Sequence, residues 1–255
     1  MSDGALKGQH AVVTGGGRGI GAAIAAALAE QGATLTLMGR DSARLGARAQ
    51  ALAAHAVTVD IADADSVSAA FARATAAAGP VHILVNNAGV AASAPFARTD
   101  LALWTQMLGV NLTGTYLCCR QVISGMLERR YGRVVNIASS AGLTGYAYVT
   151  AYCAAKHGVI GLTRALALET ARENVTVNAV CPGYTDTDMV AEAVANIMDK
   201  TGKSEEQARA ALVSRNPQQR LVQPEEVANA VLWLCMPGTA AITGQAIAVA
   251  GGEVL

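Results

Sequence analysis

Short apolar runs alternate along the chain with longer amphipathic or alanine-rich stretches of helical length. The apolar runs cover residues 11–14, 34–38, 57–59, 83–85, 134–137, 175–180 and 246–249. Continuous apolar runs of this length are typical of strands that are buried on both faces. Their alternation with helices indicates a parallel sheet covered by helices on both sides. We therefore predict one α/β domain over residues 1–255, with a doubly wound, seven-stranded parallel sheet.

Residues 186–219 interrupt this alternation of predicted strands and helices. The segment is polar and mixed, contains Gly202 and Pro217, and follows the end of a predicted strand. A pair of surface helices and a mobile substrate lid both fit its composition. Ligands of open α/β sheets bind beyond the carboxyl ends of the strands, so we favour the lid.

The composition supports a packed globular protein. The 255 residues are 52% hydrophobic, 15% charged and only 4% aromatic, which suits close packing of helices on a sheet rather than disorder. Nineteen basic and nineteen acidic residues give no overall positive field, so nucleic acid is not an expected partner.

Cysteine and histidine usage predicts neither disulfides nor a metal site. The five cysteines are odd in number and include no CxxC, which indicates buried thiols in a reducing compartment. Residues 1–8 lack the apolar core of a signal peptide, and no apolar run is long enough to span a bilayer. We expect a cytoplasmic protein without membrane contact. The four histidines lack metal-ligand spacing: His10, His55, His82 and His157.

A glycine-rich turn follows the first predicted strand and opens a helix. Gly15, Gly19 and Gly21 stand in the pattern GxxxGxG. Glycines let a pyrophosphate approach the backbone, and the helix N-terminus offers free N–H groups and the positive end of its dipole. In this strand–turn–helix setting, a dinucleotide site in a Rossmann-like domain is favoured over a purely structural turn.

The residues after the second strand favour NADP(H). A carboxylate at this point usually binds the 2′-hydroxyl of NAD, but this chain has Gly39 and Arg40. A guanidinium matches the 2′-phosphate of NADP, and Arg18 offers a second positive charge. NAD(H) is kept as the alternative, because Arg40 can also stack on adenine or face water and Asp41 follows directly.

Tyr152 and Lys156 lie four residues apart in a predicted helix, on one face and one turn apart. Reduction of a ketone needs a proton donor, and a phenol with a pKa of about 10 is a slow acid/base near neutral pH. A nearby ammonium favours the phenolate and lowers that pKa. Taken alone, the spacing is better explained by a pair of residues on the surface of a helix.

The chain resembles the short-chain dehydrogenase/reductase family over essentially its whole length. The resemblance is carried by the glycine turn, by Asn86-Asn87-Ala88-Gly89, by Ser139, by the Tyr152–Lys156 pair and by Pro182-Gly183, in the family's order. It implies a catalytic set of Asn111, Ser139, Tyr152 and Lys156.

The resemblance also implies the role of each catalytic residue. Tyr152 is the acid/base, and Lys156 tunes it and binds the nicotinamide ribose. Ser139, preferred over Ser140 by the family's spacing, donates to the substrate oxygen. Asn111 holds a water that relays protons; as alternatives, it is an ordinary helix residue or a glycosylation sequon.

The same resemblance implies the cofactor contacts. Asp60 and Ile61 flank the adenine. Asp60 can also be a helix cap or a turn acid, which does not exclude the adenine contact. Asn86, Ala88 and Gly89 line the adenosine-ribose side, and Thr187 lies near the carboxamide. The full predicted set is Gly15, Gly17, Arg18, Gly19, Ile20, Gly21, Arg40, Asp60, Ile61, Asn87, Ala88, Gly89, Tyr152, Lys156, Pro182, Gly183, Thr185 and Thr187.

Residues 125–139, 177–183 and 222–227 resemble 3-ketoacyl reductases of fatty-acid and polyketide synthesis, and related 3-hydroxyacyl-CoA dehydrogenases. A 3-ketoacyl thioester is the leading substrate class. Arg129, Arg130 and Arg172 are expected near one another, where they would attract a carrier or CoA phosphate, although arginines at helix ends are commonly only solvated.

Two other functions are kept open. One is the reduction or oxidation of a free cyclic, aromatic or aliphatic ketone or alcohol. The other is a non-catalytic nucleotide-binding subunit, which the presence of both Tyr152 and Lys156 disfavours. The predicted pocket is mostly small or apolar, which suits an acyl, cyclic or aromatic ketone over a sugar; it includes Ala91, Ala94, Gly142, Leu143, Tyr146, Val149, Tyr184 and Met189.

The family resemblance implies a homotetramer or a dimer. The predicted interfaces are the helices over residues 111–130 and 152–172, with residues 247–255 at a second interface. The sequence is consistent with this, because both helices are rich in Ala, Leu and Val on several faces.

Overall fold

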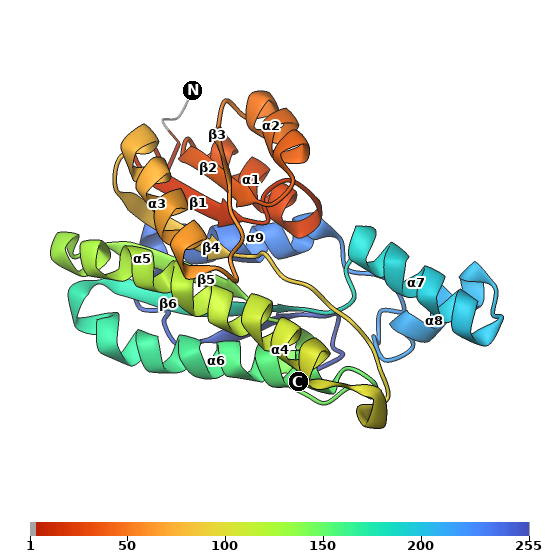
Figure 1. Ribbon diagram of the computed structural model, residues 1–255. Helices are drawn as coiled ribbons and strands as arrows, with labels where there is room; N and C mark the ends of the chain where they lie inside the picture. Colours follow the sequence, from red (N-terminus) through yellow and green to blue (C-terminus); the bar gives the residue numbers. More distant parts are fainter. Residues whose placement is uncertain (1–3, 255) are drawn as a thin grey trace.

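Within residues 4–254, which the computed structural model describes, seven strands form one parallel sheet in the order β3-β2-β1-β4-β5-β6-β7 (Figure 1). This confirms the predicted α/β sheet; residues 1–3 and 255 of the predicted domain lie outside the described part. The strands are β1 (His10–Thr14), β2 (Thr34–Gly39), β3 (His55–Thr58), β4 (Val81–Asn86), β5 (Gly132–Ile137), β6 (Val175–Pro182) and β7 (Ala246–Val249).

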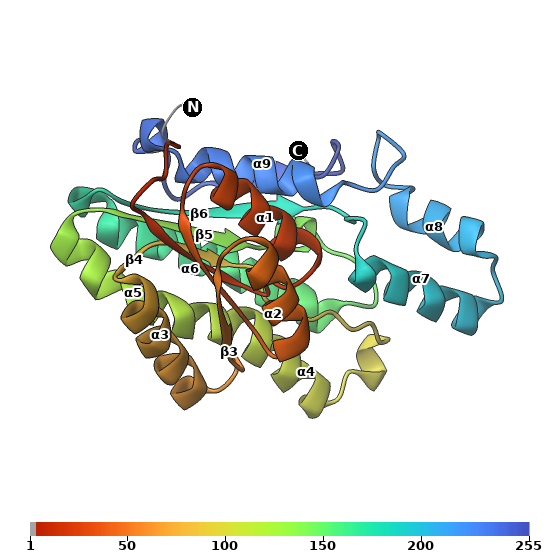
Figure 2. The same ribbon diagram turned by 90° about the horizontal axis from the view of Figure 1, so that it is seen from above.

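Helices cover both faces of the sheet, as Figure 2 shows from above. One face carries α1 (Gly19–Glu30), α2 (Ser42–Ala51) and α9 (Pro224–Cys235), with an apolar core that includes Ile24, Leu45 and Val231. The opposite face carries α3 (Ala64–Ala78), α5 (Gly114–Arg129) and α6 (Thr150–Thr170), packed around Phe71, Val122 and Ala167. The central strands β1, β5 and β6 are buried along their whole length, which explains why their sequences are mainly apolar.

The strand ends differ from the predicted ones by one or two residues. β4 includes Asn86, β5 begins at Gly132 and β6 continues to Pro182. Backbone hydrogen bonds to the neighbouring strand define these ends, and such bonds do not require an apolar side chain. The chain order reverses between β1 and β4, which are direct neighbours, so the carboxyl ends of these two strands open the crevice where such sheets bind nucleotides.

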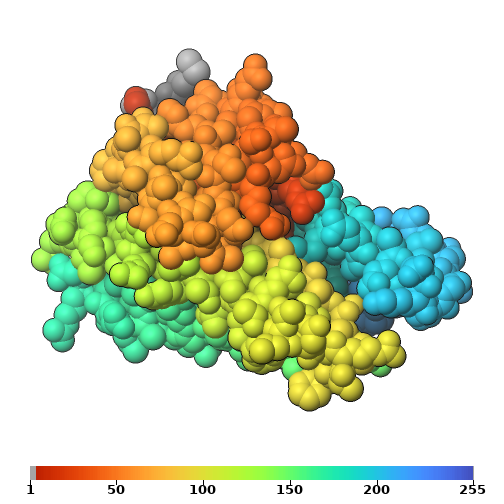
Figure 3. All heavy atoms as spheres, viewed as in Figure 1, coloured from red at the N-terminus to blue at the C-terminus, as the bar shows by residue number. Residues whose placement is uncertain are grey.

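Residues 186–219 form mainly two helices, α7 (Asp188–Thr201) and α8 (Glu205–Val213). They project from one side of the molecule, where their atoms are cyan to blue in Figure 3. Their contact has its own apolar cluster of Val190, Val194, Ala208 and Leu212. The segment is therefore a helix pair attached beyond β6, and its action as a lid stays a prediction.

The remaining helical segments join the main elements. α4 (Leu101–Leu108) continues through a π-helical turn over Gly109–Thr113 into α5. Short 3₁₀ turns lie at Phe96–Arg98, Ser140–Gly142, Ala171–Glu173 and Pro237–Thr239. Among residues 4–254, no helix combines the length and the apolar character needed to cross a membrane.

Candidate active site

The glycine turn between β1 and α1 is built for a ligand to approach its backbone. Gly15 has φ +66°, a conformation that glycine adopts without strain, and a Cβ at Gly21 would lie 2.2 Å from the carbonyl oxygen of Gly15. Arg18, the N-cap of α1, provides no side-chain hydrogen bond to the first turn. The N–H groups of that turn are thus available to a phosphate, so the residues present fit a dinucleotide.

Asn87 ties this turn to β4. Its Nδ2 donates to the carbonyl oxygens of Thr14 at 3.0 Å and Gly15 at 3.2 Å. In return, Oγ1 of Thr14 accepts from the backbone N–H groups of Asn87 and Ala88, both at 3.0 Å. The two strands at the switch point are therefore locked together where the crevice begins.

Asn86 does not line the adenosine ribose, and this part of the prediction is wrong. Its side chain is buried, and Nδ2 donates to Oδ1 of Asn136 at 2.9 Å within the sheet. Side chains of successive strand residues point to opposite faces. The side chain of Asn87 points toward β1, so that of Asn86 points into the core.

Arginines gather beside the predicted 2′-phosphate position. Arg40 is exposed and makes no ion pair with another described residue. Arg18 and Arg44 each place a guanidinium nitrogen 3.1 Å from Oδ2 of Asp188, the first residue of α7. These two guanidinium groups lower the pKa of Asp188.

A hollow of about 280 Å³ lies at the same place, lined by Gly17, Arg44, Ala47, Arg48 and Ala51. Arg44 and Arg48 were not among the predicted site residues. The available signal was spacing, because Arg40, Arg44 and Arg48 recur every four residues.

Two acidic residues near the cofactor site have local structural partners. Asp41 caps α2: its Oδ1 accepts from the backbone N–H of Arg44 at 3.0 Å, and its Oδ2 lies 3.3 Å from Nε of Arg44. Oδ1 of Asp60 accepts from the backbone N–H of Ala62 at 3.0 Å, which is the turn-acid alternative. Ile61 is buried, and a Cβ at Gly114 would lie 2.9 Å from its carbonyl oxygen.

Tyr152 and Lys156 lie in the first two turns of α6, at the carboxyl end of β5. Nζ of Lys156 donates to the carbonyl oxygen of Ile137 at 2.8 Å and lies 5.6 Å from the centre of the Tyr152 ring. Lys156 is almost fully buried. The predicted pair is thus a site pair and not a surface pair.

Of the two adjacent serines, Ser139 faces Tyr152. Its hydroxyl lies beside the Tyr152 phenol and acts to lower the pKa of the phenol. The hydroxyl of Ser140 instead accepts from the Tyr146 phenol at 2.9 Å. This separation agrees with the choice of Ser139 over Ser140.

Burial controls the ionisation of the pair. It raises the pKa of Tyr152 to about 12 and lowers the pKa of Lys156 to about 8. The expectation that Lys156 by itself lowers the pKa of Tyr152 is therefore wrong. The ammonium is costly to bury and bonds to the Ile137 carbonyl, so it does not offset the desolvation of the phenolate.

Asn111 lies in the π-helical turn and fixes the loop after β4. Its Nδ2 donates to the carbonyl oxygens of Val90 at 2.9 Å and Met107 at 3.0 Å, and its Oδ1 accepts from the N–H of Val90 at 3.2 Å. A Cβ at Gly89 would lie 2.7 Å from this Oδ1 and 3.7 Å from Nζ of Lys156. Gly89 is needed so that Asn111 and Lys156 can both approach this loop.

The residues predicted around the nicotinamide follow β6 and return to the glycine turn. Oγ1 of Thr185 donates to the carbonyl oxygen of Gly183 at 3.0 Å, and Oγ1 of Thr187 donates to that of Thr185 at 3.2 Å. A Cβ at Gly19 would lie 3.1 Å from Cγ2 of Thr187. The segment over residues 182–187 therefore crosses the crevice beside the first glycines of α1.

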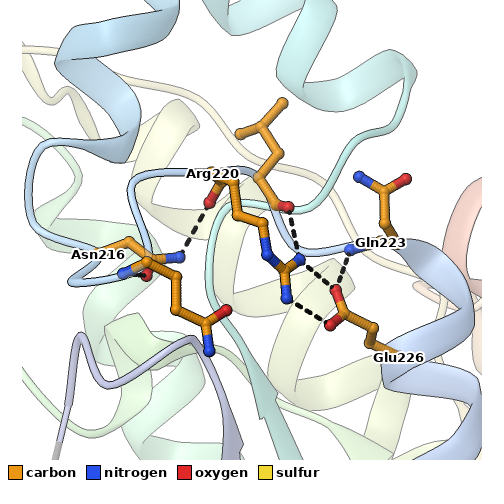
Figure 4. A network of polar contacts seen from close by, with 6 residues as sticks. Asn216, Arg220, Gln223 and Glu226 are labelled. Carbon is orange, nitrogen blue, oxygen red and sulfur yellow. Dashed lines mark hydrogen bonds and ion pairs between the residues drawn. The ribbon is translucent and has the colours of Figure 1, made fainter.

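A polar network fixes the far end of the helix pair to α9 (Figure 4). Arg220 makes two contacts of 2.6 Å with the carboxylate of Glu226, which also accepts from the N–H of Gln223 at 2.8 Å. Nδ2 of Asn216 donates to the carbonyl oxygen of Arg220 at 2.9 Å. The turn after α8 is thereby held in one position. Sequence analysis did not assign this network to the site.

Of the three arginines expected near one another, Arg130 and Arg172 are in contact, and the guanidinium groups of Arg129 and Arg130 have local partners. Arg129 donates to the carbonyl oxygen of Val81 at 2.7 Å, and Arg130 pairs with Glu173 at 3.2 Å. Arg130 also donates to the carbonyl oxygen of Arg172 at 3.4 Å. These arginines therefore fit the alternative, in which arginines near helix ends have no role in binding a phosphate.

A doubly wound sheet with a glycine turn at its switch point, facing a tyrosine, serine, lysine and asparagine, defines a nucleotide-dependent oxidoreductase. The family model described as short chain dehydrogenase matches residues 9–197. The chain belongs to this family.

Similar proteins include ketoacyl reductases. A putative ketoacyl reductase of Streptomyces coelicolor is 41% identical over 96% of each chain. A 3-oxoacyl-acyl-carrier-protein reductase of Aquifex aeolicus is 40% identical over 97% of this chain and 98% of its own. The crystal structure of a variant of actinorhodin polyketide ketoreductase with NADPH has a TM-score of 0.93 and 40% identity, over 96% of this chain and 97% of the other.

Proposed function

We propose that this protein reduces ketones to secondary alcohols with NADPH, and that 3-ketoacyl thioesters are its substrate class. The observation that carries the proposal is the contact of Tyr152 with both Ser139 and Lys156 at the carboxyl end of β5. The similarity to ketoacyl reductases over nearly the whole chain supports the substrate class.

In this proposal the bound nicotinamide cofactor supplies the hydride. Tyr152 donates the proton to the carbonyl oxygen, because its high pKa keeps the phenol protonated until the oxygen becomes negative. Ser139 donates a hydrogen bond to the same oxygen, and Lys156 positions the nicotinamide ribose. Asn111 holds the loop at Gly89 beside Lys156; its water relay stays a prediction.

The preference for NADP(H) is supported by the arginines at residues 18, 40, 44 and 48. Asp41, the residue that left NAD(H) open, is occupied as the cap of α2, which weakens that alternative.

The homotetramer and the cytoplasmic location remain part of the proposal.

Free cyclic, aromatic or aliphatic ketones are the second candidate class. The observation in their favour is that Arg129 and Arg130 are engaged with Val81 and Glu173 and form no open phosphate site. A non-catalytic role stays remote, because all four catalytic groups are present.

The test is a reductase assay with NADPH and NADH against acetoacetyl thioesters and simple ketones, followed by nicotinamide absorbance. We expect the highest kcat/KM with NADPH and an acetoacetyl thioester. Higher kcat/KM with free ketones would transfer the proposal to the second class, and bound cofactor without turnover of any substrate would reject it.

A further inference from the structure

Tyr146 lies between Ser140, the neighbour of the catalytic Ser139, and Arg215 at the end of the helix pair. Its phenol donates to Ser140 at 2.9 Å, and the ring of Tyr184 meets it edge-on, with centres 6.4 Å apart. The guanidinium carbon of Arg215 lies 4.4 Å from the centre of the Tyr146 ring. Two tyrosines and one arginine therefore lie together beside Ser140, the neighbour of Ser139.

Glu253 comes to the same place from the segment after β7. A Cβ at Gly183 would lie 3.0 Å from its Oε2. Burial raises the pKa of Tyr146 and of Tyr184, and in both cases the Glu253 carboxylate adds to the rise. A carboxylate thus stands beside both rings, near the segment predicted to hold the nicotinamide.

One oxygen of this carboxylate lacks a hydrogen-bond donor. Oε1 of Glu253 is buried and has no partner among the described residues. A buried carboxylate oxygen without a donor is costly, and such atoms call for a missing partner. Neither neighbouring donor fills this role among the described residues. The Tyr146 phenol donates to Ser140 at 2.9 Å, and Arg215 donates to the carbonyl oxygen of Gly145 at 3.3 Å.

The position of Glu253 is set by the anchored turn of Figure 4. Gly251 has φ +61°, and a Cβ there would lie 2.3 Å from Oδ1 of Asn216. A Cβ at Gly252 would lie 3.3 Å from Cγ of Pro217. The two glycines let the chain pass directly against the turn that begins next to Arg215, so the same packing brings both Arg215 and Glu253 to Tyr146.

We propose that Glu253 is a specificity-determining residue that accepts a hydrogen bond from a donor group of the substrate, remote from the reacting carbonyl. The donor is an amide N–H, as in the arm of an acyl thioester, or a hydroxyl, as in a cyclic hydroxyketone. This inference rests on the proposed function. It states that the protein selects among ketones by a donor group that takes no part in the reaction.

The test compares matched substrates. Acetoacetyl-N-acetylcysteamine carries an amide N–H, and S-ethyl acetoacetate does not; 4-hydroxycyclohexanone carries a hydroxyl, and cyclohexanone does not. For one of these pairs we expect the wild-type protein to favour the donor-bearing member at least about tenfold in kcat/KM, as for a hydrogen bond to a charged group. The pair that shows the preference identifies the source of the donor.

Glu253→Ala should abolish this preference mainly through KM of the donor-bearing substrate, and Glu253→Gln, whose amide oxygen still accepts, should restore part of it. Glu225→Gln, an exposed change on α9, is the control. Equal kcat/KM within both wild-type pairs, or an unchanged preference in Glu253→Ala, would overturn the proposal. The wild-type comparison remains decisive if Glu253→Ala does not fold.

Binding separates this inference from the proposed function. Calorimetry with 3-hydroxybutyryl-N-acetylcysteamine and ethyl 3-hydroxybutyrate, and with 1,4-cyclohexanediol and cyclohexanol, needs no turnover. Preferential binding of a donor-bearing member, lost in Glu253→Ala, would support the subsite even if no ketone were reduced. Turnover without any preference would keep the proposed function and reject the subsite.

Discussion

At the scale of single residues, the site places its ionisable groups in surroundings that oppose their charge. Tyr152 is held protonated by burial, and Lys156 is buried with one carbonyl partner, Ile137. Burial of the Lys156 ammonium destabilises the protein at neutral pH, whereas the Tyr152 phenol is neutral there in both the folded and the unfolded chain. Three predictions follow from individual side chains.

Replacing Tyr152 with Phe removes only the phenol oxygen. We expect kcat to fall at least about 100-fold, since the proton donor is lost, with the Kd for NADPH changed less than about threefold. Stopped-flow turnover and fluorescence titration of NADPH measure the two quantities. Tyr148→Phe, at an exposed tyrosine, is the control, and turnover retained in Tyr152→Phe would reject the acid/base role.

Lys156→Met should stabilise the protein measured without cofactor at pH 7. The pKa of Lys156 is about 8 in the folded state and 10.5 unfolded, so between these values the unfolded chain binds more protons and wild-type stability rises with pH. The shift corresponds to at most about 3 kcal/mol, and losing the bond to Ile137 reduces the gain.

Urea unfolding from pH 7 to 10.5 tests this prediction. The advantage of Lys156→Met should shrink as the pH rises through this window. Lys203→Met, at an exposed site, should show no such trend. An advantage that does not depend on pH would mean that burial of the ammonium is not its source.

Arg40→Ala should raise KM for NADPH by about tenfold and leave KM for NADH nearly unchanged, because a guanidinium–phosphate contact is lost only with NADPH. Arg172→Ala is the matched control, since it lies at the far end of α6 from Tyr152. Steady-state kinetics with both cofactors measure the effect, and equal changes for the two would exclude the 2′-phosphate role.

The sequence predicted single residues well where a motif fixes their neighbourhood. Ser139 follows the end of β5 and Tyr152 lies in the first turn of α6, so the motif places both at the same edge of the sheet, and Lys156 follows one helical turn after Tyr152. The predicted ribose contact of Asn86 and the predicted direction of the Tyr152 pKa were wrong. Side-chain direction and desolvation depend on the packed environment, which a local motif does not describe. Glu253 had no local signal, since its neighbours are distant in the chain.

At the scale of elements, the helix pair is fixed at both ends and projects between them. Asp188 at its start contacts Arg18 and Arg44, and the turn after α8 is tied to α9 through Arg220 and Glu226. The sequence indicated this segment because residues 186–219 interrupt the alternation of strands and helices. The contacts that anchor it join residues from separate elements, so no local pattern predicted them.

Glu226→Gln should loosen the turn after α8, because it removes the charge that binds both nitrogens of Arg220. The pair is partly exposed, so we expect a loss of stability of at most about 1 kcal/mol. The larger effect should be a severalfold rise in KM for the ketone, with KM for NADPH unchanged. Glu225→Gln in the same helix turn is the control, and identical kinetics in both variants would show that the network does not shape the pocket.

At the scale of the whole molecule, large apolar side chains remain uncovered on the helices predicted to form interfaces. Leu168 on α6 is 84% exposed and Tyr116 on α5 is 45% exposed. Apolar residues of this size on neighbouring helices are typical of association surfaces. The family resemblance pointed to these helices, but the oligomeric state itself is still a prediction.

Leu168→Glu should dissociate the proposed homotetramer, because a carboxylate would be buried without a partner when the α6 helices meet. Light scattering after size exclusion measures the mass of the particle. Leu101→Glu changes a residue on α4 that is 77% exposed and outside the predicted interface, and its mass should stay that of the wild type. A wild-type monomer, or a tetramer that survives Leu168→Glu, would contradict the prediction.

The packing of Gly251 against Asn216 has a consequence for synthesis on the ribosome. The glycine turn, β4 and the catalytic face of α6 all emerge before residues 251–253, and chains begin to fold from the N-terminal side during translation. Glu253 takes its place only where residues 251–253 pack against the turn after α8. We therefore expect this contact to form after the glycine turn, β4 and α6 have been synthesised.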